Sequence, residues 1–176
     1  MKLAALSALT VLCVSGALEA QPRHVDVRLR GHQHAVRLDT IALWNLIAAP
    51  SARTFAAVRH VLEELDVPVT TADSVNGVFY TSPFITSRRI LGKRMSWALS
   101  CGQGITGPNA DSYTIQMAYA IFLEPTVDQQ TRIGIALASG ATTTEGTSTG
   151  PVRCGSTGAF EREIAMLVRA RAQVQE

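Results

Sequence analysis

The chain has 176 residues, of which 47% are hydrophobic and 17% are charged, and its formal net charge is +2. This length suits one domain, and the apolar content is sufficient for one core, so the composition excludes an intrinsically disordered chain. The near-neutral balance and the scattered arginines argue against nucleic-acid binding, which normally needs a dense basic face. Aromatic residues make up only 6% of the chain, so we expect a mainly aliphatic core.

The first 20 residues have the pattern of a secretory signal peptide. Lys2 supplies the positive start, residues 3–14 form an apolar run, and small residues lead to Ala20, after which we expect cleavage. The apolar run is shorter than the roughly 20 residues of a membrane-spanning helix; an uncut N-terminal anchor is the alternative interpretation. The sequence therefore predicts an exported protein, periplasmic or extracellular. It would have a signal peptide at 1–20, one domain at 21–176 and no stable membrane span after cleavage.

Loss of the signal peptide removes Cys13 and leaves two cysteines, Cys101 and Cys154. An even count in an exported chain favours a disulfide, because the compartment does not keep thiols reduced. We therefore predict a Cys101–Cys154 bond with Cα atoms about 5–6 Å apart. Two buried free thiols are the alternative, and a redox-active pair is not expected because the chain has no Cys-x-x-Cys motif.

After the signal peptide, residues 24–30 alternate apolar and polar side chains and predict a short strand. Residues 35–47 predict a second extended segment, which Pro50 terminates. The apolar spacing then changes to that of an amphipathic helix, which we expect over 51–65 with Ser51 as its N-cap.

The middle of the domain predicts several antiparallel strands. Two extended runs flank Asn76–Gly77, a dipeptide that favours a tight hairpin turn. Residues 95–101 place alternate apolar side chains on one side of a further strand. The clearest strand is 112–124, whose alternation is typical of an antiparallel strand with one buried face. Residues 131–139 repeat this pattern, so we expect the last two segments to form a hairpin.

Residues 139–150 contain almost no large apolar side chain and predict a loop or a ragged extension of the preceding strand. A second helix is expected after Cys154, beginning near Thr157 or Gly158, with Glu161 in a first turn where negative charge suits the helix dipole. The order of elements predicts an α+β domain. It would have an antiparallel sheet of about four to six strands and two helices packed on one face, in two layers.

The run from Ser51 to Tyr80, a helix followed by PVTTADSVNG and a strand, resembles the helix-grip modules of BamC, an outer-membrane assembly lipoprotein. This resemblance implies a hollow between helix and curved sheet in which a small apolar ligand binds. Cys101-Gly102, NADSY at 109–113 and CGSTGAFE at 154–161 resemble instead an uncharacterised family of bacterial secreted proteins. Unlike BamC, this chain has one module, no lipobox and a predicted disulfide.

Three histidines near the start of the domain, His24, His32 and His34, are the main candidates for metal chemistry. His32 and His34 lie on one side of a strand, a spacing that can hold Zn²⁺ or Cu²⁺ if acidic partners converge. Asp26 and Asp39 are the nearest carboxylates in the sequence. The alternative interpretation is that all three histidines are solvated.

Two other motifs lead to no catalytic assignment. Residues 102–107, GQGITG, match G-x-G-x-x-G, but no helix is expected after them, so they do not predict a dinucleotide site. Residues 156–158 could bind an anion at a helix start, although we favour ordinary capping for them. We therefore expect no catalytic residue and no cofactor.

Together these features predict an exported cell-envelope binding or adaptor module whose partner is a protein or a small apolar ligand. The alternative is a secreted metal-dependent hydrolase that uses the region of His24, His32 and His34.

Overall fold

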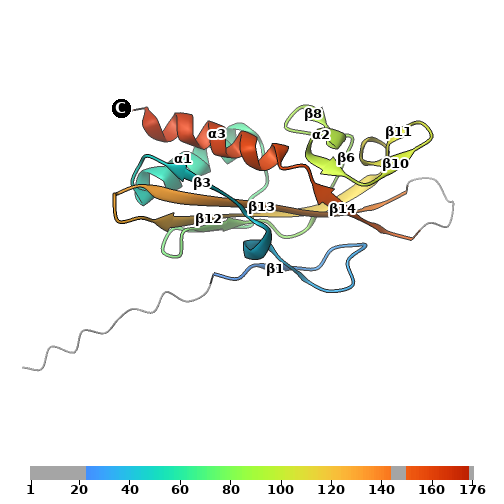
Figure 1. The fold of residues 1–176 in the computed structure, drawn as a ribbon, viewed down its shortest axis with the longest axis horizontal. Coiled ribbons are helices and arrows are strands. Elements are labelled where there is room, and N and C mark those ends of the chain that lie inside the picture. The colour runs from blue at the N-terminus through green and yellow to red at the C-terminus, as the bar shows by residue number, and fades with distance from the viewer. Residues whose placement is uncertain (1–22, 144–149, 175–176) are drawn as a thin grey trace, which may run out of the picture.

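The computed structural model describes residues 23–143 and 150–174. Its centre is a long hairpin of strands β12 (Thr114–Pro125) and β13 (Thr131–Thr142), drawn in yellow and orange in Figure 1. The two strands pair over their whole length, which confirms the predicted hairpin. β13 continues to Thr142, so residues 139–142 form a strand extension. The predicted signal peptide at 1–20 lies outside the described residues.

Shorter strands pair with each outer edge of this hairpin, two in succession on either side. The edge of β12 pairs with β6 (Phe84–Ser87) and β5 (Val78–Tyr80), and β4 (Thr71–Asp73) lies beyond β5. The edge of β13 pairs with β3 (Leu43–Ile47) and β14 (Val152–Ser156), and β9 (Leu99–Ser100) lies beyond β14. Within the described residues the main sheet is antiparallel and has eight strands in six positions.

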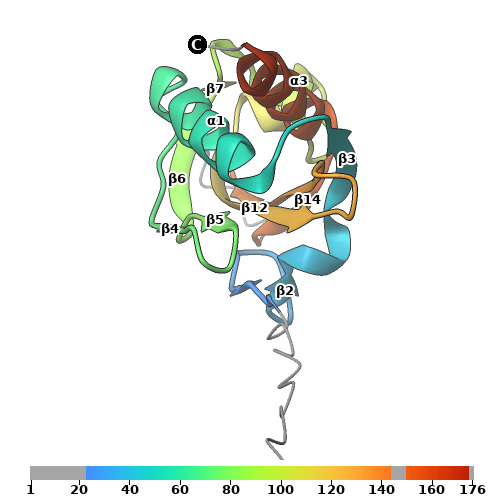
Figure 2. The same ribbon diagram turned by 90° about the vertical axis from the view of Figure 1, so that its left-hand side faces the viewer.

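Helices α1 (Ser51–Glu64) and α3 (Ala159–Gln173) cover one face of this sheet, as Figures 1 and 2 show. Tyr119, Ile121 and Phe160 are among the side chains buried between the helices and the sheet. The predicted α+β class, with an antiparallel sheet and helices on one face, is confirmed. Ser51, the expected N-cap, is instead the first helical residue, because the extended Pro50 precedes it and occupies the cap position.

The N-terminal part of the domain covers the opposite face of the sheet (Figure 2). It contains β1 (Asp26–Val27), β2 (Val36–Arg37) and the 3-10 helix η1 (Leu38–Ile41). A second apolar cluster lies beneath it: Val27, Leu29, Leu38, Val78, Ala118, Ala120, Phe122, Ala136 and Ala138. We expected the 112–124 strand to have one buried face. In the middle of this strand both faces are buried, so the expectation is wrong there. Ala118 and Ala120 lie on the second face of this strand. Their small side chains gave no sign in the sequence of a buried position, yet both are fully buried.

Two glycines of β13 allow close contacts, one with this N-terminal part and one with β3. A Cβ on Gly140 would lie 1.7 Å from the carbonyl oxygen of Arg30, so only glycine lets the chain cross the sheet there. A Cβ on Gly134 would lie 2.8 Å from the ring of Trp44, which pairs with this glycine across the strands. The contact at Gly140 lets the segment around Arg30 lie directly on the sheet, whereas the contact at Gly134 lets Trp44 of β3 cover its neighbour on β13.

The strand predicted at 95–101 is wrong over most of its length. Met95–Ala98 form the short helix α2, and only Leu99–Ser100 are extended. Asp111 stabilises the start of α2, because its carboxylate accepts hydrogen bonds from the backbone N–H and the hydroxyl of Ser96 at 2.8 and 2.9 Å. Met95 and Ala98 are both buried at the helical spacing of three, which the alternating pattern concealed.

The remaining elements are short: β7 (Arg89–Ile90), β8 (Lys93–Arg94), β10 (Gln103–Gly104), β11 (Gly107–Pro108) and the 3-10 helix η2 (Asn109–Asp111). The hairpin predicted around Asn76–Gly77 is present as β4 and β5, and the Asp73 carboxylate accepts hydrogen bonds from the backbone N–H groups of Val75 and Asn76 in its turn. Of the helices described, none has the length and apolarity to cross a bilayer.

Candidate functional site

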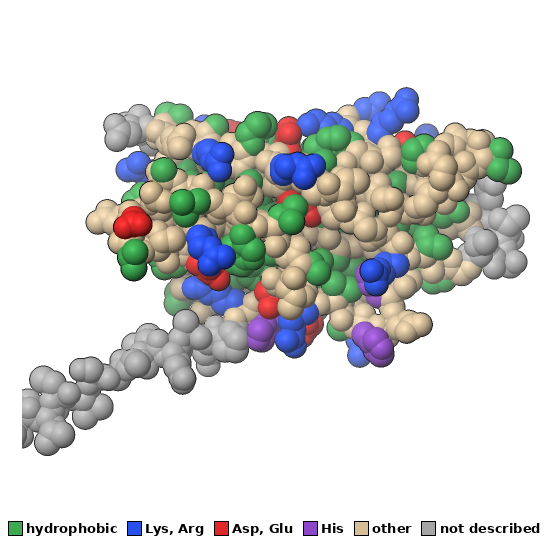
Figure 3. Space-filling model, viewed as in Figure 1, with side chains coloured by type: hydrophobic (Ala, Val, Ile, Leu, Met, Phe, Trp, Pro, Cys, Tyr) green, Lys and Arg blue, Asp and Glu red, His purple; other side chains and the backbone are tan. Residues whose placement is uncertain are grey.

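A pocket opens at the edge of the sheet where two strands diverge from β13. β3 pairs with Thr131–Ile135 and β14 with Ser139–Ala141, so no described strand pairs with residues 136–138 on this edge. The pocket has a volume of about 380 Å³ and lies between η1 and β3 on one side and β14 and the start of α3 on the other. Figure 3 shows this side of the molecule, with hydrophobic side chains near its centre and histidines and basic residues below them.

The backbone of Leu137 faces the gap between β3 and β14. The N–H of Leu123 donates to the carbonyl of Gly77 at 2.8 Å, so Leu123 directs its backbone groups away from β13. Ile133 lies opposite Leu123, and in an antiparallel pair it must therefore direct its own groups away from β12. Every second residue repeats this orientation. Leu137 accordingly presents its backbone groups to the gap, where no described strand pairs with it.

The pocket wall is mainly apolar and open. It includes the side chains of Val36, Ile41, Leu43, Leu137 and Ala138. Ile41 and Leu43 are 44% and 41% exposed, which is high for side chains of this size beside a core. A Cβ built on Gly155 would meet nothing within 4 Å, whereas one built on Gly158 would lie 3.1 Å from Leu43 Cδ1. Leu43 and the start of α3 therefore approach each other at one end, and open space remains beside β14.

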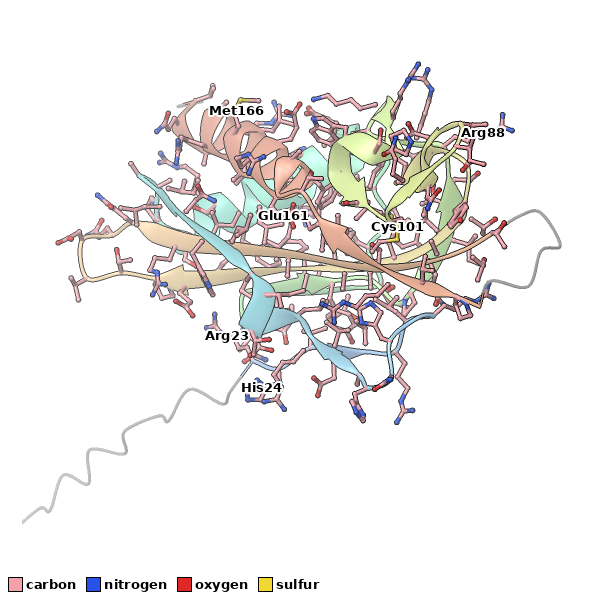
Figure 4. The ribbon with its side chains drawn as sticks, turned by 45° about the vertical axis from the view of Figure 1, so that its right-hand side comes forward. Arg23, His24, Arg88, Cys101, Glu161 and Met166 are labelled. Atoms are coloured by element: carbon pink, nitrogen blue, oxygen red, sulfur yellow. A yellow bond between two sulfur atoms is a disulfide. The ribbon has the colours of Figure 1, made fainter. Side chains whose placement is uncertain are left out.

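Glu161 is the buried polar residue of this pocket. It is only 2% exposed, and Figure 4 shows it on the first turn of α3, above the point where β3 and β14 separate. Its Oε1 accepts a hydrogen bond of 2.6 Å from the Ser156 hydroxyl, whereas its buried Oε2 has no hydrogen-bond partner among the described residues. A buried polar atom without a partner is unfavourable, and because Oε2 is closed off from solvent, a ligand would reach it only after a local rearrangement.

Burial raises the pKa of the Glu161 carboxyl above its usual range. The Ser156 hydroxyl, the backbone N–H groups of Glu161 and Leu137, and the positive charge of Arg162 oppose this shift; the two N–H groups lie near the carboxyl but do not meet hydrogen-bond geometry at Oε2. The sequence predicted Glu161 in the first turn of the helix, where it suits the dipole, but its burial was not predicted. A signal was present, because Glu161 is in phase with the apolar positions of α3, Ile164, Val168 and Ala172.

Residues 156–158 form hydrogen-bonded turns at the start of α3, whose N-cap is Gly158. The Ser156 hydroxyl accepts from the Gly158 N–H at 3.0 Å, and the Thr157 hydroxyl accepts from the Ala159 N–H at 3.3 Å. The Thr157 hydroxyl also donates to the carbonyl of Trp97 at 2.6 Å, which connects the helix start to α2. These contacts favour the capping interpretation over an anion site at this helix start.

The three histidines have different surroundings. His24 Nδ1 lies 3.1 Å from Asp39 Oδ2, on the underside of the molecule in Figure 4. His32 Nε2 lies 2.9 Å from the carbonyl oxygen of Ser139. His34 lines a second cavity. Across residues 23–143 and 150–174, no three or more His, Cys, Asp or Glu side chains are grouped to hold a metal ion. Of the three histidines, only His24 contacts one of the two predicted acidic partners, Asp39, and this contact is a single hydrogen bond.

The two cysteines lie at disulfide distance. The Sγ atoms of Cys101 and Cys154 are 2.02 Å apart, and their Cα atoms are 4.3 Å apart, closer than the 5–6 Å expected from the sequence. Both residues are buried, and Cys154 lines the pocket. The shorter Cα distance follows from the position of the pair, since β14 and β9 are neighbouring strands that bring the two backbones together.

No protein-family model matches this chain, and no curated protein is similar enough to count as a relative. The geometry of this pocket is therefore the main indication of function.

Proposed function

We propose that this protein is an exported binding module of the cell envelope that holds a small, mainly apolar ligand in the pocket between β3 and β14. The observation that carries the proposal is an open, mainly apolar pocket at the edge of the sheet, with the exposed side chains of Ile41 and Leu43 in its wall. Its volume of about 380 Å³ falls in the range typical of small-molecule sites. The hollow between helix and sheet, which the BamC resemblance implied, is instead occupied by core side chains.

Two features support export. The first 20 residues have the composition of a signal peptide, and the Cys101–Cys154 pair lies at disulfide distance. Disulfides persist mainly in oxidising compartments, so the two features point to the same location although they are independent of each other.

The polar groups of the pocket are suited to orienting a ligand. Ser156 is held in place, because its hydroxyl donates to Glu161 and accepts from the Gly158 N–H. A few fixed polar groups in an apolar wall are typical of sites that select a ligand by its shape and orientation.

A neutral fluorescent probe, N-phenyl-1-naphthylamine, tests this proposal on the protein without its signal peptide. We expect saturable binding with enhanced fluorescence. The substitution Gly155→Phe, which fills open space in the pocket, should weaken binding by about tenfold or more, an effect of roughly 1.4 kcal/mol.

Gly150→Phe is the matched control, because a Cβ there also meets nothing within 4 Å and Gly150 does not line the pocket. Circular dichroism and thermal unfolding verify that both variants fold. Absence of saturable binding to the wild type, or equal binding by the two variants, would refute the proposed site.

A further inference from the structure

A second cavity continues from the proposed pocket. It has a volume of about 490 Å³ and lies between the loop of residues 31–36 and β14. His32, Val36 and Arg153 line both cavities, so the two share a wall. Together they form one groove, with an apolar end beside β3 and a polar end beside the 31–36 loop.

The polar end of the groove is cationic. Among the described residues that line it, Arg153 carries a positive charge, His32 and His34 are the other titratable groups, and none is acidic. Arg153 forms no ion pair with a described residue, whereas Arg132, at the other end of β13, pairs with Glu124. A guanidinium without a counterion at a concave surface favours an anion, and its planar fork matches the two oxygens of a carboxylate.

His32 is fixed beside Arg153 in this groove. The carbonyl oxygen of Ser139 can only accept a hydrogen bond, so the Nε2 of His32, 2.9 Å away, carries the proton and donates it. Cys154 pairs with Ser139 across the strands, and Arg153 is the residue before it. The histidine ring and the arginine are therefore both anchored to the same short stretch of β13 and β14.

Glu161 does not neutralise Arg153. It is the one acidic side chain among the described residues that line either cavity, and it forms no ion pair with Arg153. One of its oxygens is already held by Ser156, at the start of α3. The groove therefore has an apolar section with a buried carboxyl and, adjoining it, a section in which the positive charge of Arg153 has no ion-pair partner among the described residues.

On the basis of the proposed function, we propose that the ligand is a single-chain amphipathic carboxylate of the fatty-acid type. Its apolar chain lies along Ile41 and Leu43, and its carboxylate binds Arg153, which determines the specificity for an anionic headgroup. The apolar cavity, about 380 Å³ in volume, has room for one short chain.

The test compares dodecanoate with 1-dodecanol, which has the same chain and no charge, by displacement of N-phenyl-1-naphthylamine. We expect the wild type to bind dodecanoate at least tenfold more tightly than dodecanol. Arg153→Gln should remove this preference by weakening dodecanoate binding about tenfold, with dodecanol binding unchanged. Arg53→Gln removes the same charge from an exposed site on α1 outside both cavities, so it should change neither affinity.

Equal affinity for the two ligands, or the same result with Arg153→Gln and Arg53→Gln, would overturn the carboxylate proposal. Tighter binding of dodecyl phosphate or of dodecyltrimethylammonium than of dodecanoate would also overturn it. These failures leave the binding-module proposal intact if the neutral probe still binds and Gly155→Phe still weakens it. Failure of the neutral probe to bind would overturn the proposed function itself.

Discussion

At the residue scale, Glu161 links stability to pH. Burial is the largest cause of its raised pKa, and the hydrogen bond from Ser156 is the strongest of the interactions that oppose this rise. A carboxyl whose pKa is higher in the folded than in the unfolded chain binds its proton more tightly when folded. Glu161 therefore destabilises the fold above its unfolded pKa, about 4.3, and the loss increases as the pH rises through the folded pKa.

We predict that Glu161→Gln raises the free energy of unfolding relative to the wild type at about pH 8 and changes it little at about pH 4. The amide cannot ionise, and its Oε1 can still accept the hydrogen bond from Ser156. Urea unfolding across this pH range measures the effect, and Glu63→Gln is the control because Glu63 is exposed on α1. A difference between Glu161→Gln and wild type that does not vary with pH would contradict the prediction.

At the element scale, several interactions anchor β14 and the start of α3 to the rest of the domain. Cys154 on β14 lies at disulfide distance from Cys101, and the Thr157 N–H donates to the carbonyl of Ala98 at 2.9 Å. α3 also packs against α1 and the sheet. The Ser/Thr/Gly-rich segment before it in the sequence suggested a weakly held helix, but these contacts anchor it. The cysteine pair consequently bears most directly on β9, β14 and the wall of the pocket that Cys154 lines.

We predict that Cys101 and Cys154 are bonded in the mature protein, so that a thiol reagent finds no reactive thiol after unfolding without reductant. Replacing Cys154 with Ser should lower the free energy of unfolding by about 2–4 kcal/mol, because the bond closes a long loop, the two cysteines being 53 residues apart. Hydrogen exchange should accelerate first in β9, β14 and the start of α3. Two reactive thiols in the unfolded wild type would show that the disulfide is absent.

At the scale of the whole molecule, the sheet is covered on both faces. The helices cover one face, and the N-terminal part of the domain covers the other with Val27, Leu29 and Leu38. This second cover also forms one side of the ligand groove, through the 31–36 loop and η1. Binding and stability are therefore expected to depend on the same segment of chain.

We predict that Leu38→Ala lowers the free energy of unfolding by about 2–5 kcal/mol, because Leu38 is fully buried beneath the N-terminal segment. Leu46→Ala should cost less than about 1 kcal/mol, since Leu46 is 50% exposed on β3. Urea denaturation of both variants provides the comparison. Similar losses for the two leucines would indicate that the N-terminal segment does not pack on the sheet in solution.

The sequence by itself determined the elements whose signal is local. The spacing of Phe55, Val58 and Leu62 is sufficient to specify α1, and the alternation along 112–124 and 131–139 is sufficient for the central hairpin. Each of these segments is long enough for its period to be unambiguous, and each period follows from backbone geometry alone. At 95–101 the segment is too short for alternation to be distinguished from one helical turn, and the tertiary contact from Asp111 decides the outcome.

Only the tertiary structure decided the groove and the role of Glu161. The pocket exists because β3 ends its pairing with β13 at Ile135 and β14 begins at Ser139. Strand register and the points at which neighbouring strands separate depend on pairings between residues that are far apart in the chain, and no local pattern encodes them. Glu161, Arg153 and His32 come from three such segments, so the sequence supplied the side chains and the packing of the sheet edge brought them to one groove.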